Sequence, residues 1–140
     1  MEAKTFIRTV SDRLRCDDAR AESVTLAVFQ VLRDRLTPHE AGDVLAQLPH
    51  GLRSLWTDND RPGREVERIH RDEFVGRVRA FAGLPEESEA ERAVRAVFAV
   101  LQHTLGSPTG TEGEAWDVYS QLPKDMKKLW LEAGRGDRGS

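Results

Sequence analysis

Few residues in this 140-residue chain have the types and spacing that chemistry requires. His39 and Asp43 are four residues apart, so on a helix they would share one face and could hold a metal ion together. Glu112, Glu114 and Asp117 include a pair of carboxylates three residues apart, with no histidine near them in sequence. Acidic residues also favour the first turn of any helix, where they complement the helix dipole. We therefore interpret both groups as solvated helix starts and predict no metal site.

Two other segments come near a metal-binding or reactive pattern. Residues 58–63 resemble the start of a calcium-binding loop, but Ile69 stands where such a loop closes with a glutamate ligand. Cys16 precedes a predicted helix start, which can lower a thiol pKa, yet Asp17 and Asp18 beside it oppose a thiolate. No serine lies in a nucleophile elbow, and no glycine-rich phosphate-binding loop occurs. We expect no catalytic residue and no cofactor, and we lean against an enzyme.

Composition narrows the functional classes further. The chain is 39% hydrophobic and 32% charged, which is typical of a soluble globular protein, and no apolar stretch approaches the length of a membrane span. A net charge of −3 provides no excess of positive charge to attract the phosphate groups of a nucleic acid. The start of the chain lacks the pattern of a secretory signal, and a single cysteine precludes an internal disulfide. Arginine also outnumbers lysine 17 to 4. We expect a cytoplasmic, bacterial protein with no membrane partner.

The elements that would position any site come from an internal duplication. Three blocks of the first half recur in the second: Phe6–Val10 in Phe74–Val78, Ala27–Leu32 in Ala96–Leu101, and Val44–Pro49 in Val118–Pro123. The offset between the copies is 68, then 69, then 74 residues, so five extra residues fall in the loop that begins at Gly106. Drift confined to a loop is what a true duplication produces, because loops tolerate insertions.

Each half is predicted to form four helices, because apolar residues recur there at helical spacing between turn signals. In the second half these helices are expected at about 71–82, 86–105, 112–122 and 124–132. The long helix that ends at Leu36 is apolar on more than one side, which predicts a central position. Thr37 with Glu40 forms a capping-box pattern, and Thr111 with Glu114 repeats it 74 residues later.

These patterns predict an all-α fold: a tandem repeat of two four-helix units packed into one compact helical bundle with pseudo-two-fold symmetry. The predicted organisation is a first unit over residues 1–57, a linker over 58–69, a second unit over 70–133 and a disordered tail over 134–140.

The repeated motifs resemble a bacterial family known only as domain of unknown function 2267. The likeness rests on three motifs that occur in both halves and together span about Lys4 to Leu131: an opening Phe-x-x-x-Val, a central Ala-Val-Phe-x-Val-Leu, and Gln-Leu-Pro followed by spaced apolar residues and tryptophan. The resemblance implies an all-helical fold. It implies no activity, cofactor or catalytic residue.

Function is better sought where the two copies differ. Trp116 has no counterpart, because Gly42 holds the equivalent position, so this aromatic residue is a candidate for a partner contact. Lys124, Lys127 and Lys128 place three of the four lysines on one turn of the last helix, close to Trp130. We predict Trp116 and these lysines as the residues that contact a partner.

Three functions stay open. The first is a small helical protein–protein interaction module without catalytic activity, whose partner is another protein or a second copy of the chain. The second is an enzyme or small-ligand binder with its site in the cleft between the two units, which predicts carboxylates or histidines of shifted pKa there. The third is weak nucleic-acid binding through the lysine-rich last helix, which the negative net charge disfavours.

Overall fold

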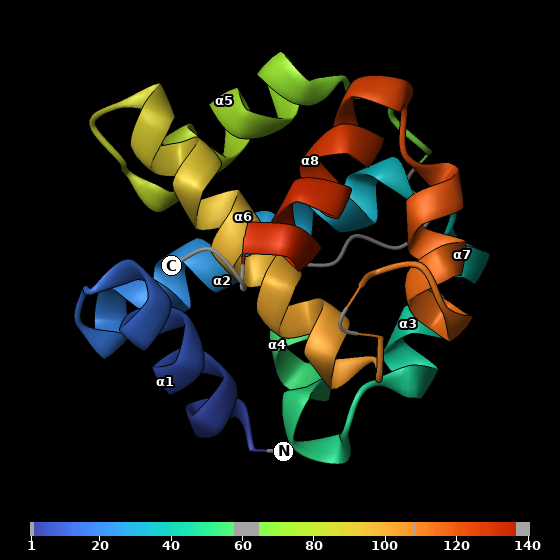
Figure 1. Ribbon diagram of the computed structural model, residues 1–140, viewed down its shortest axis with the longest axis horizontal. Coiled ribbons are helices and arrows are strands. Elements are labelled where there is room, and N and C mark those ends of the chain that lie inside the picture. Colours follow the sequence, from blue (N-terminus) through green and yellow to red (C-terminus); the bar gives the residue numbers. More distant parts are fainter. Residues whose placement is uncertain (1, 58–64, 108, 137–140) are drawn as a thin grey trace.

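The computed structural model describes residues 2–57, 65–107 and 109–136. Within these ranges the chain is helical, with no strand, so the predicted all-α class is confirmed (Figure 1). No helix in this part of the chain has both the length and the apolar character that crossing a bilayer would need. The elements in chain order are α1 Ala3–Leu14, α2 Asp18–Arg35, α3 Pro38–Gln47, the 3₁₀-helix η1 His50–Leu52, α4 Arg53–Thr57, α5 Arg71–Ala82, α6 Glu87–Thr104, α7 Gly113–Gln121 and α8 Lys124–Gly136.

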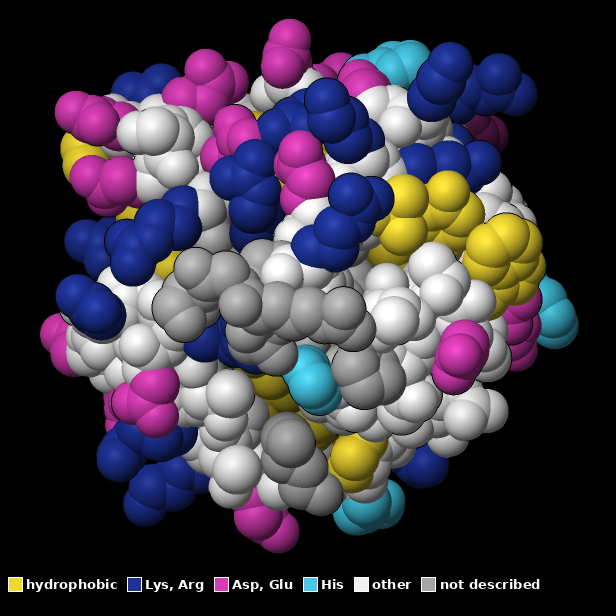
Figure 2. Space-filling model, in the orientation of Figure 1, with side chains coloured by type: hydrophobic (Ala, Val, Ile, Leu, Met, Phe, Trp, Pro, Cys, Tyr) yellow, Lys and Arg dark blue, Asp and Glu magenta, His cyan; other side chains and the backbone are white. Residues whose placement is uncertain are grey.

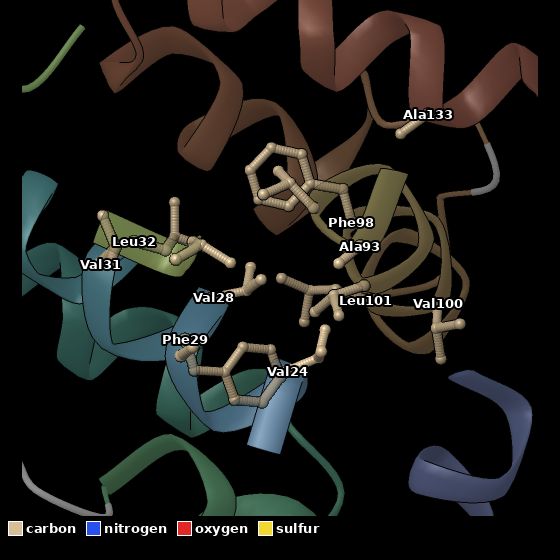
Figure 3. Close-up of a cluster of buried hydrophobic side chains, with 14 of the residues drawn as sticks. Val24, Val28, Phe29, Val31, Leu32, Ala93, Phe98, Val100, Leu101 and Ala133 are labelled. Atoms are coloured by element: carbon tan, nitrogen blue, oxygen red, sulfur yellow. The ribbon is translucent and has the colours of Figure 1, made fainter. Parts of the chain in front are cut away.

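The two longest helices, α2 and α6, pack against each other at the centre of the molecule. Helix α1 contacts both of them, and so does α5, while α3 and α7 lie side by side at one end (Figure 1). In the core, Val28 of α2 points toward Leu101 of α6, and both are fully buried (Figure 3). The predicted central position of the helix ending near Leu36 is confirmed.

Residues that the duplication aligns make matching contacts in the core. An aromatic row connects the first, second and last helices of each half through edge-on or tilted rings, which is the geometry aromatic pairs prefer. In the first half the row is Phe6–Phe29–Trp56, with successive ring centroids 5.6 and 5.2 Å apart. In the second half it is Phe74–Phe98–Trp130, with successive centroids 5.8 and 4.9 Å apart.

The polar atoms of the two buried tryptophans are satisfied in the same way in each half. Nε1 of Trp56 donates to the carbonyl oxygen of Ala41 at 3.0 Å, and Nε1 of Trp130 donates to that of Gly110 at 2.6 Å. The carbonyl oxygen of Trp56 accepts from Nη1 of Arg33, and that of Trp130 accepts from Nε2 of Gln102 at 2.9 Å. Arg33 and Gln102 are equivalent by the repeat, so two different side chains donate to the carbonyl oxygen of the tryptophan in their respective halves.

One of the two predicted capping boxes forms. Before α3, Oγ1 of Thr37 accepts from the backbone N–H of Glu40 at 3.0 Å, and Oε1 of Glu40 accepts from the N–H of Thr37 at 3.1 Å. The prediction at Thr111 is wrong, because α7 begins later, with Glu112 as its N-cap and no side-chain cap. There Ser107 Oγ accepts from the N–H groups of Thr111 and Glu112, at 3.1 and 3.0 Å.

The physical reason for the missing box is that the N–H of Thr111, which Glu114 would have to bond, already donates to Oγ of Ser107. Glu114, which was expected to reach back toward Thr111, instead has its carboxyl group hydrogen-bonded to Asp117. The other predicted boundaries hold more closely: Asp17 caps α2 by accepting from the N–H of Arg20, and Gly83 ends α5 in the left-handed conformation.

The segments outside the two predicted units are only partly described. Positions 58–64, which include the calcium-like segment and most of the predicted linker, lie outside the described residues, as do 137–140 of the predicted tail. The end of the linker packs onto the body of the protein: Ile69 is buried, and the N–H of Glu67 donates to the carbonyl oxygen of Asp34 at 2.9 Å. Helix α8 continues to Gly136, so residues 134–136 are helical rather than part of a tail.

Two glycines in the loop between α6 and α7 test how tightly Trp130 is held. Both Gly106 and Gly110 have φ +78, but a Cβ atom at Gly110 would lie 2.6 Å from Nε1 of Trp130, whereas one at Gly106 would meet open space. Gly110→Ala should therefore cost about 3 kcal/mol or more through combined strain and overpacking. Gly106→Ala should cost about 1 kcal/mol from backbone strain alone. Urea unfolding of the two variants measures the difference, and equal losses would show that the loop does not depend on the tryptophan.

Candidate functional site

Trp116 lies on the outer face of α7 with 49% of its surface exposed. It and Phe81 of α5, 52% exposed, are the large hydrophobic side chains that the described part of the chain presents to solvent. The ring of Trp116 packs on that of Tyr119, one helical turn further along, with centroids 5.3 Å apart and planes tilted by 36°. The predicted contact residue is thus the exposed member of an aromatic pair whose other ring, Tyr119, is half-buried.

The three predicted lysines lie beside this pair. Lys124, Lys127 and Lys128 of α8 line a groove of about 300 Å³ together with Tyr119, Leu131, Glu132 and Arg135. Nζ of Lys127 lies 5.5 Å from the centroid of the Tyr119 ring, close enough for a cation–π interaction. We call Trp116, Tyr119, Lys124, Lys127 and Lys128 the aromatic–lysine surface. Figure 2 shows hydrophobic side chains over α7 with Lys and Arg side chains beside them toward α8.

The sequence prediction brought together four of these five residues but missed Tyr119, which joins them. Trp116 does not line the groove itself and connects to it only through the Tyr119 ring. The signal was present in the repeat, because Leu45 holds the position equivalent to Tyr119 in the first half. Comparing the two copies at every position of α7, rather than at tryptophan alone, would have identified the pair.

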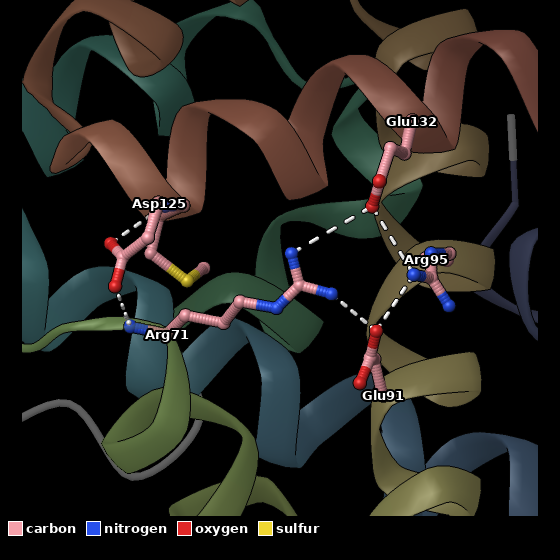
Figure 4. Close-up of polar contacts among 6 residues, drawn as sticks. Arg71, Glu91, Arg95, Asp125 and Glu132 are labelled. Atoms are coloured by element: carbon pink, nitrogen blue, oxygen red, sulfur yellow. Dashed lines mark hydrogen bonds and ion pairs between the residues drawn. The ribbon is translucent and has the colours of Figure 1, made fainter.

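The one carboxylate in the groove is already neutralised. Oε1 of Glu132 lies 3.2 Å from Nη2 of Arg95 and 3.8 Å from Nη1 of Arg71, and both arginines also contact Glu91 (Figure 4). By contrast, none of the ion pairs found among the described residues involves the three lysines. The aromatic–lysine surface therefore has an excess of positive charge, although the chain as a whole is negative.

Asp125 holds α8 in the position that presents these lysines. Its Oδ2 accepts from the backbone N–H of Arg71 at 3.1 Å and its Oδ1 from that of Met126 at 2.8 Å (Figure 4). Burial opposes ionisation of this carboxyl group, but the two backbone N–H groups and the nearby His70 lower its pKa below the ordinary value. The start of α5 is thus tied to the start of α8.

A second feature lies on the opposite side of α7, where α7 meets α3. A hollow of about 240 Å³ is lined by four carboxylates, Glu40 and Asp43 from α3 and Glu114 and Asp117 from α7, over Leu36, Val44, Val118 and Gln121. The carboxylates are equivalent in pairs, because both pairs are separated by the repeat offset of 74. We call this the acidic hollow. It is a cleft between the two predicted units that has both polar and apolar walls.

Glu114 has an unusual environment in the acidic hollow. Burial, the hydrogen bond with Asp117 and the negative charges of Asp117 and Asp43 raise its pKa to about 7. At neutral pH this carboxyl group therefore exchanges between its neutral and charged forms. The described residues contain no group of three or more His, Cys, Asp or Glu side chains arranged to hold a metal ion, the four carboxylates of the hollow included.

The remaining candidates of the sequence analysis lie apart from both features or add little to them. His39 and Asp43 do approach each other, with 3.6 Å between Nε2 and Oδ2, but both are largely exposed. The pKa of Cys16 is raised, first by burial and then by the charge of Asp17, so the thiol is protonated and a poor nucleophile at neutral pH.

The fold and these two surfaces define an all-helical protein with an exposed aromatic and basic face and an acidic hollow, without a recognisable catalytic constellation among the described residues. The family model described as "Uncharacterized conserved protein (DUF2267)" matches residues 3–129. The chain belongs to this family, as the repeated motifs led us to expect. Comparison with curated proteins gives no match.

The raised pKa of Glu114 predicts that stability falls as pH rises. The folded state binds the proton up to about pH 7, whereas the unfolded chain releases it near its ordinary value of 4.5. Stability is therefore lost between about pH 4.5 and 7, as the folded carboxyl group becomes charged beside Asp117. Glu114→Gln, which stays neutral, should match wild type at pH 5 and exceed it at pH 8 by about 1 kcal/mol, after allowance for solvent screening.

Thermal or urea unfolding at the two pH values provides the measurement. The control is Glu112→Gln, which removes an exposed carboxylate of the same helix start that does not line the hollow. The same pH-dependent gain in both variants would mean that the effect arises from net charge and not from the hollow.

Proposed function

We propose that this protein is a small helical protein–protein interaction module that binds its partner through the aromatic–lysine surface. The observation that supports this most directly is the half-exposed Trp116, packed on Tyr119 and adjoining three lysines that have no ion pair among the described residues. Tryptophan and tyrosine are enriched among the residues that dominate the energetics of protein interfaces, and here the exposed tryptophan does not stand alone but adjoins a tyrosine ring and a positively charged groove.

The proposal also covers the arrangement of the two units, the kind of partner and the location in the cell. We take the chain to be two related four-helix units, related by approximate two-fold symmetry, that share one core; the matching aromatic rows and tryptophan hydrogen bonds support this. We take the partner to be another protein, with a second copy of this chain as the alternative. A bacterial, cytoplasmic location is proposed from the arginine-rich composition and the single cysteine.

Replacement of Trp116 tests the surface directly. Trp116→Ala should abolish retention of the partner in an affinity pull-down from cells that express the chain naturally, because the aromatic anchor is removed. Phe81→Ala is the matched control, since Phe81 is an equally exposed aromatic residue on α5 that lies outside the surface. Quantitative mass spectrometry should find proteins retained by wild type and by the Phe81 variant but lost from the Trp116 variant. Identical sets from all three would contradict the proposal.

The acidic hollow supports a second candidate, a small-ligand binder with its site between the two units. Its specific support is the combination of a hollow of about 240 Å³, apolar walls and a carboxyl group whose pKa is shifted to about 7. Four carboxylates favour a small organic cation whose alkyl part contacts the apolar walls. An enzymatic role has less support, because no general acid or base lies beside a nucleophile there.

Calorimetric titration with spermidine, a flexible organic polycation, tests this candidate. Binding at pH 8 should be at least tenfold weaker in the double variant Glu114→Gln/Asp117→Asn, which removes the α7 half of the hollow. The control double variant Glu87→Gln/Glu89→Gln removes the same charge from exposed positions on α6. If both variants lose affinity equally, the polycation responds only to net charge and the hollow is not a site.

A further inference from the structure

We infer that the partner segment seated on the aromatic–lysine surface is an acidic peptide of another protein, with its carboxylates over the lysines and one apolar side chain on the Trp116–Tyr119 pair. This inference rests on the proposed function and adds the chemistry of the partner. It follows from the charge of the groove, the geometry of the ring pair, and the carboxylates at the other edge of α7.

Charge complementarity favours an acidic partner. Four cationic side chains line the groove, Lys124, Lys127, Lys128 and Arg135, against the single carboxylate of Glu132. Glu132 already interacts with Arg95 and Arg71, so it does not offset the lysines. A carboxylate brought to this groove gains attraction without first having to displace an internal partner from any of the three lysines.

The first half of the chain lacks this arrangement at its equivalent positions. Lys124, Lys127 and Lys128 correspond by the repeat to His50, Arg53 and Ser54, and the aromatic pair corresponds to Gly42 and Leu45. Of the three lysines, only Lys127 has a permanently charged counterpart, and neither Trp116 nor Tyr119 has an aromatic counterpart. The surface is therefore specific to the second half, and the first half supplies a matched control on the same protein.

The ring pair provides an apolar anchor next to the charges. The ammonium group of Lys127 lies near the Tyr119 ring, so its charge is held at the edge between the aromatic pair and the groove. The helices that present both parts are held by fully buried side chains of α8, among them Met126, Leu129 and Trp130. The site is thus preformed, and a short peptide need not pay for ordering it.

The opposite edge of α7 argues for a peptide rather than a nucleic acid. Glu112 and Asp117, both exposed, lie four residues before and one residue after Trp116, and Asp117 also lines the acidic hollow. A phosphate backbone that continued past the lysines and across the ring pair would meet these carboxylates. A peptide can place its acidic residues over α8 and an uncharged or basic end over α7. The bound peptide should therefore have a fixed direction.

Titration with synthetic peptides tests the inference. The probe is a fluorescently labelled twelve-residue peptide with six glutamates preceding a Leu-Phe pair, and its counterpart has glutamine at the six positions. The glutamate peptide should bind wild type, and the glutamine peptide at least tenfold more weakly. Lys127→Glu should weaken binding at least tenfold, whereas Arg53→Glu, with the same charge change at the equivalent exposed position, should stay within twofold. Circular dichroism confirms that both variants are folded.

Three outcomes would overturn the inference: no binding of the glutamate peptide, equal loss in the two charge variants, or tighter binding of a twelve-nucleotide thymidine strand than of the peptide. None of these outcomes decides the result of the pull-down with Trp116→Ala, which tests the proposed function separately. A partner lost on that substitution while the glutamate peptide fails to bind would keep the interaction surface and refute its acidic specificity. Conversely, peptide binding that Trp116→Ala does not weaken would refute the anchor role of the ring pair.

Discussion

The buried tryptophan near the end of the chain holds together three segments on which the aromatic–lysine surface is built. Trp130 packs on Phe98 of α6, donates from its indole N–H to Gly110 in the loop before α7, and accepts at its own carbonyl from Gln102. A buried N–H without a partner costs about 1–3 kcal/mol, so the hydrogen bond from Trp130 to Gly110 fixes the loop before α7 relative to α8. Because α7 follows that loop and α8 contains the tryptophan, Trp116 and the lysines receive their relative positions from this interaction.

The duplication made the core predictable from sequence. Alignment of the two halves identifies Phe6 with Phe74 and Trp56 with Trp130, and these residues make corresponding contacts in the structure. Such contacts depend on shape and apolarity, which residue type and helical spacing report well. Hydrogen bonds of the core were less predictable. Arg33 and Gln102 align in the repeat but differ in chemistry, so the sequence did not indicate that each donates to the carbonyl oxygen of the buried tryptophan in its half.

The second capping box and the composition of the acidic hollow both depend on segments that the local pattern around Glu114 does not describe. Ser107, in the loop before α7, takes the N–H of Thr111 that Glu114 was expected to bond, and the charge of Asp43 on α3 acts on Glu114 in the hollow. Periodicity places Glu114 and Asp117 on one helical face, but it does not tell which distant helix that face meets. The local pattern therefore favoured a cap at Thr111, where Ser107 makes the hydrogen bond instead. It predicted shifted carboxylates in a cleft between the units but could not tell which residues line that cleft, because this depends on the packing of α3 on α7.

Helix α7 lies between two features: the acidic hollow, whose carboxylates occur in both halves of the sequence, and the aromatic pair, which occurs in the second half alone. The carboxylates between α3 and α7 are paired by the sequence repeat, Glu40 with Glu114 and Asp43 with Asp117, so the repeat accounts for both acidic walls of the hollow. The ring pair toward α8 does not recur in the first half. What distinguishes Trp116 from Phe81, the other exposed aromatic of the described residues, is its setting, because its ring packs on Tyr119 beside the lysine groove. The partner proposed at Trp116 would account for this combination, which the packing of the core does not require.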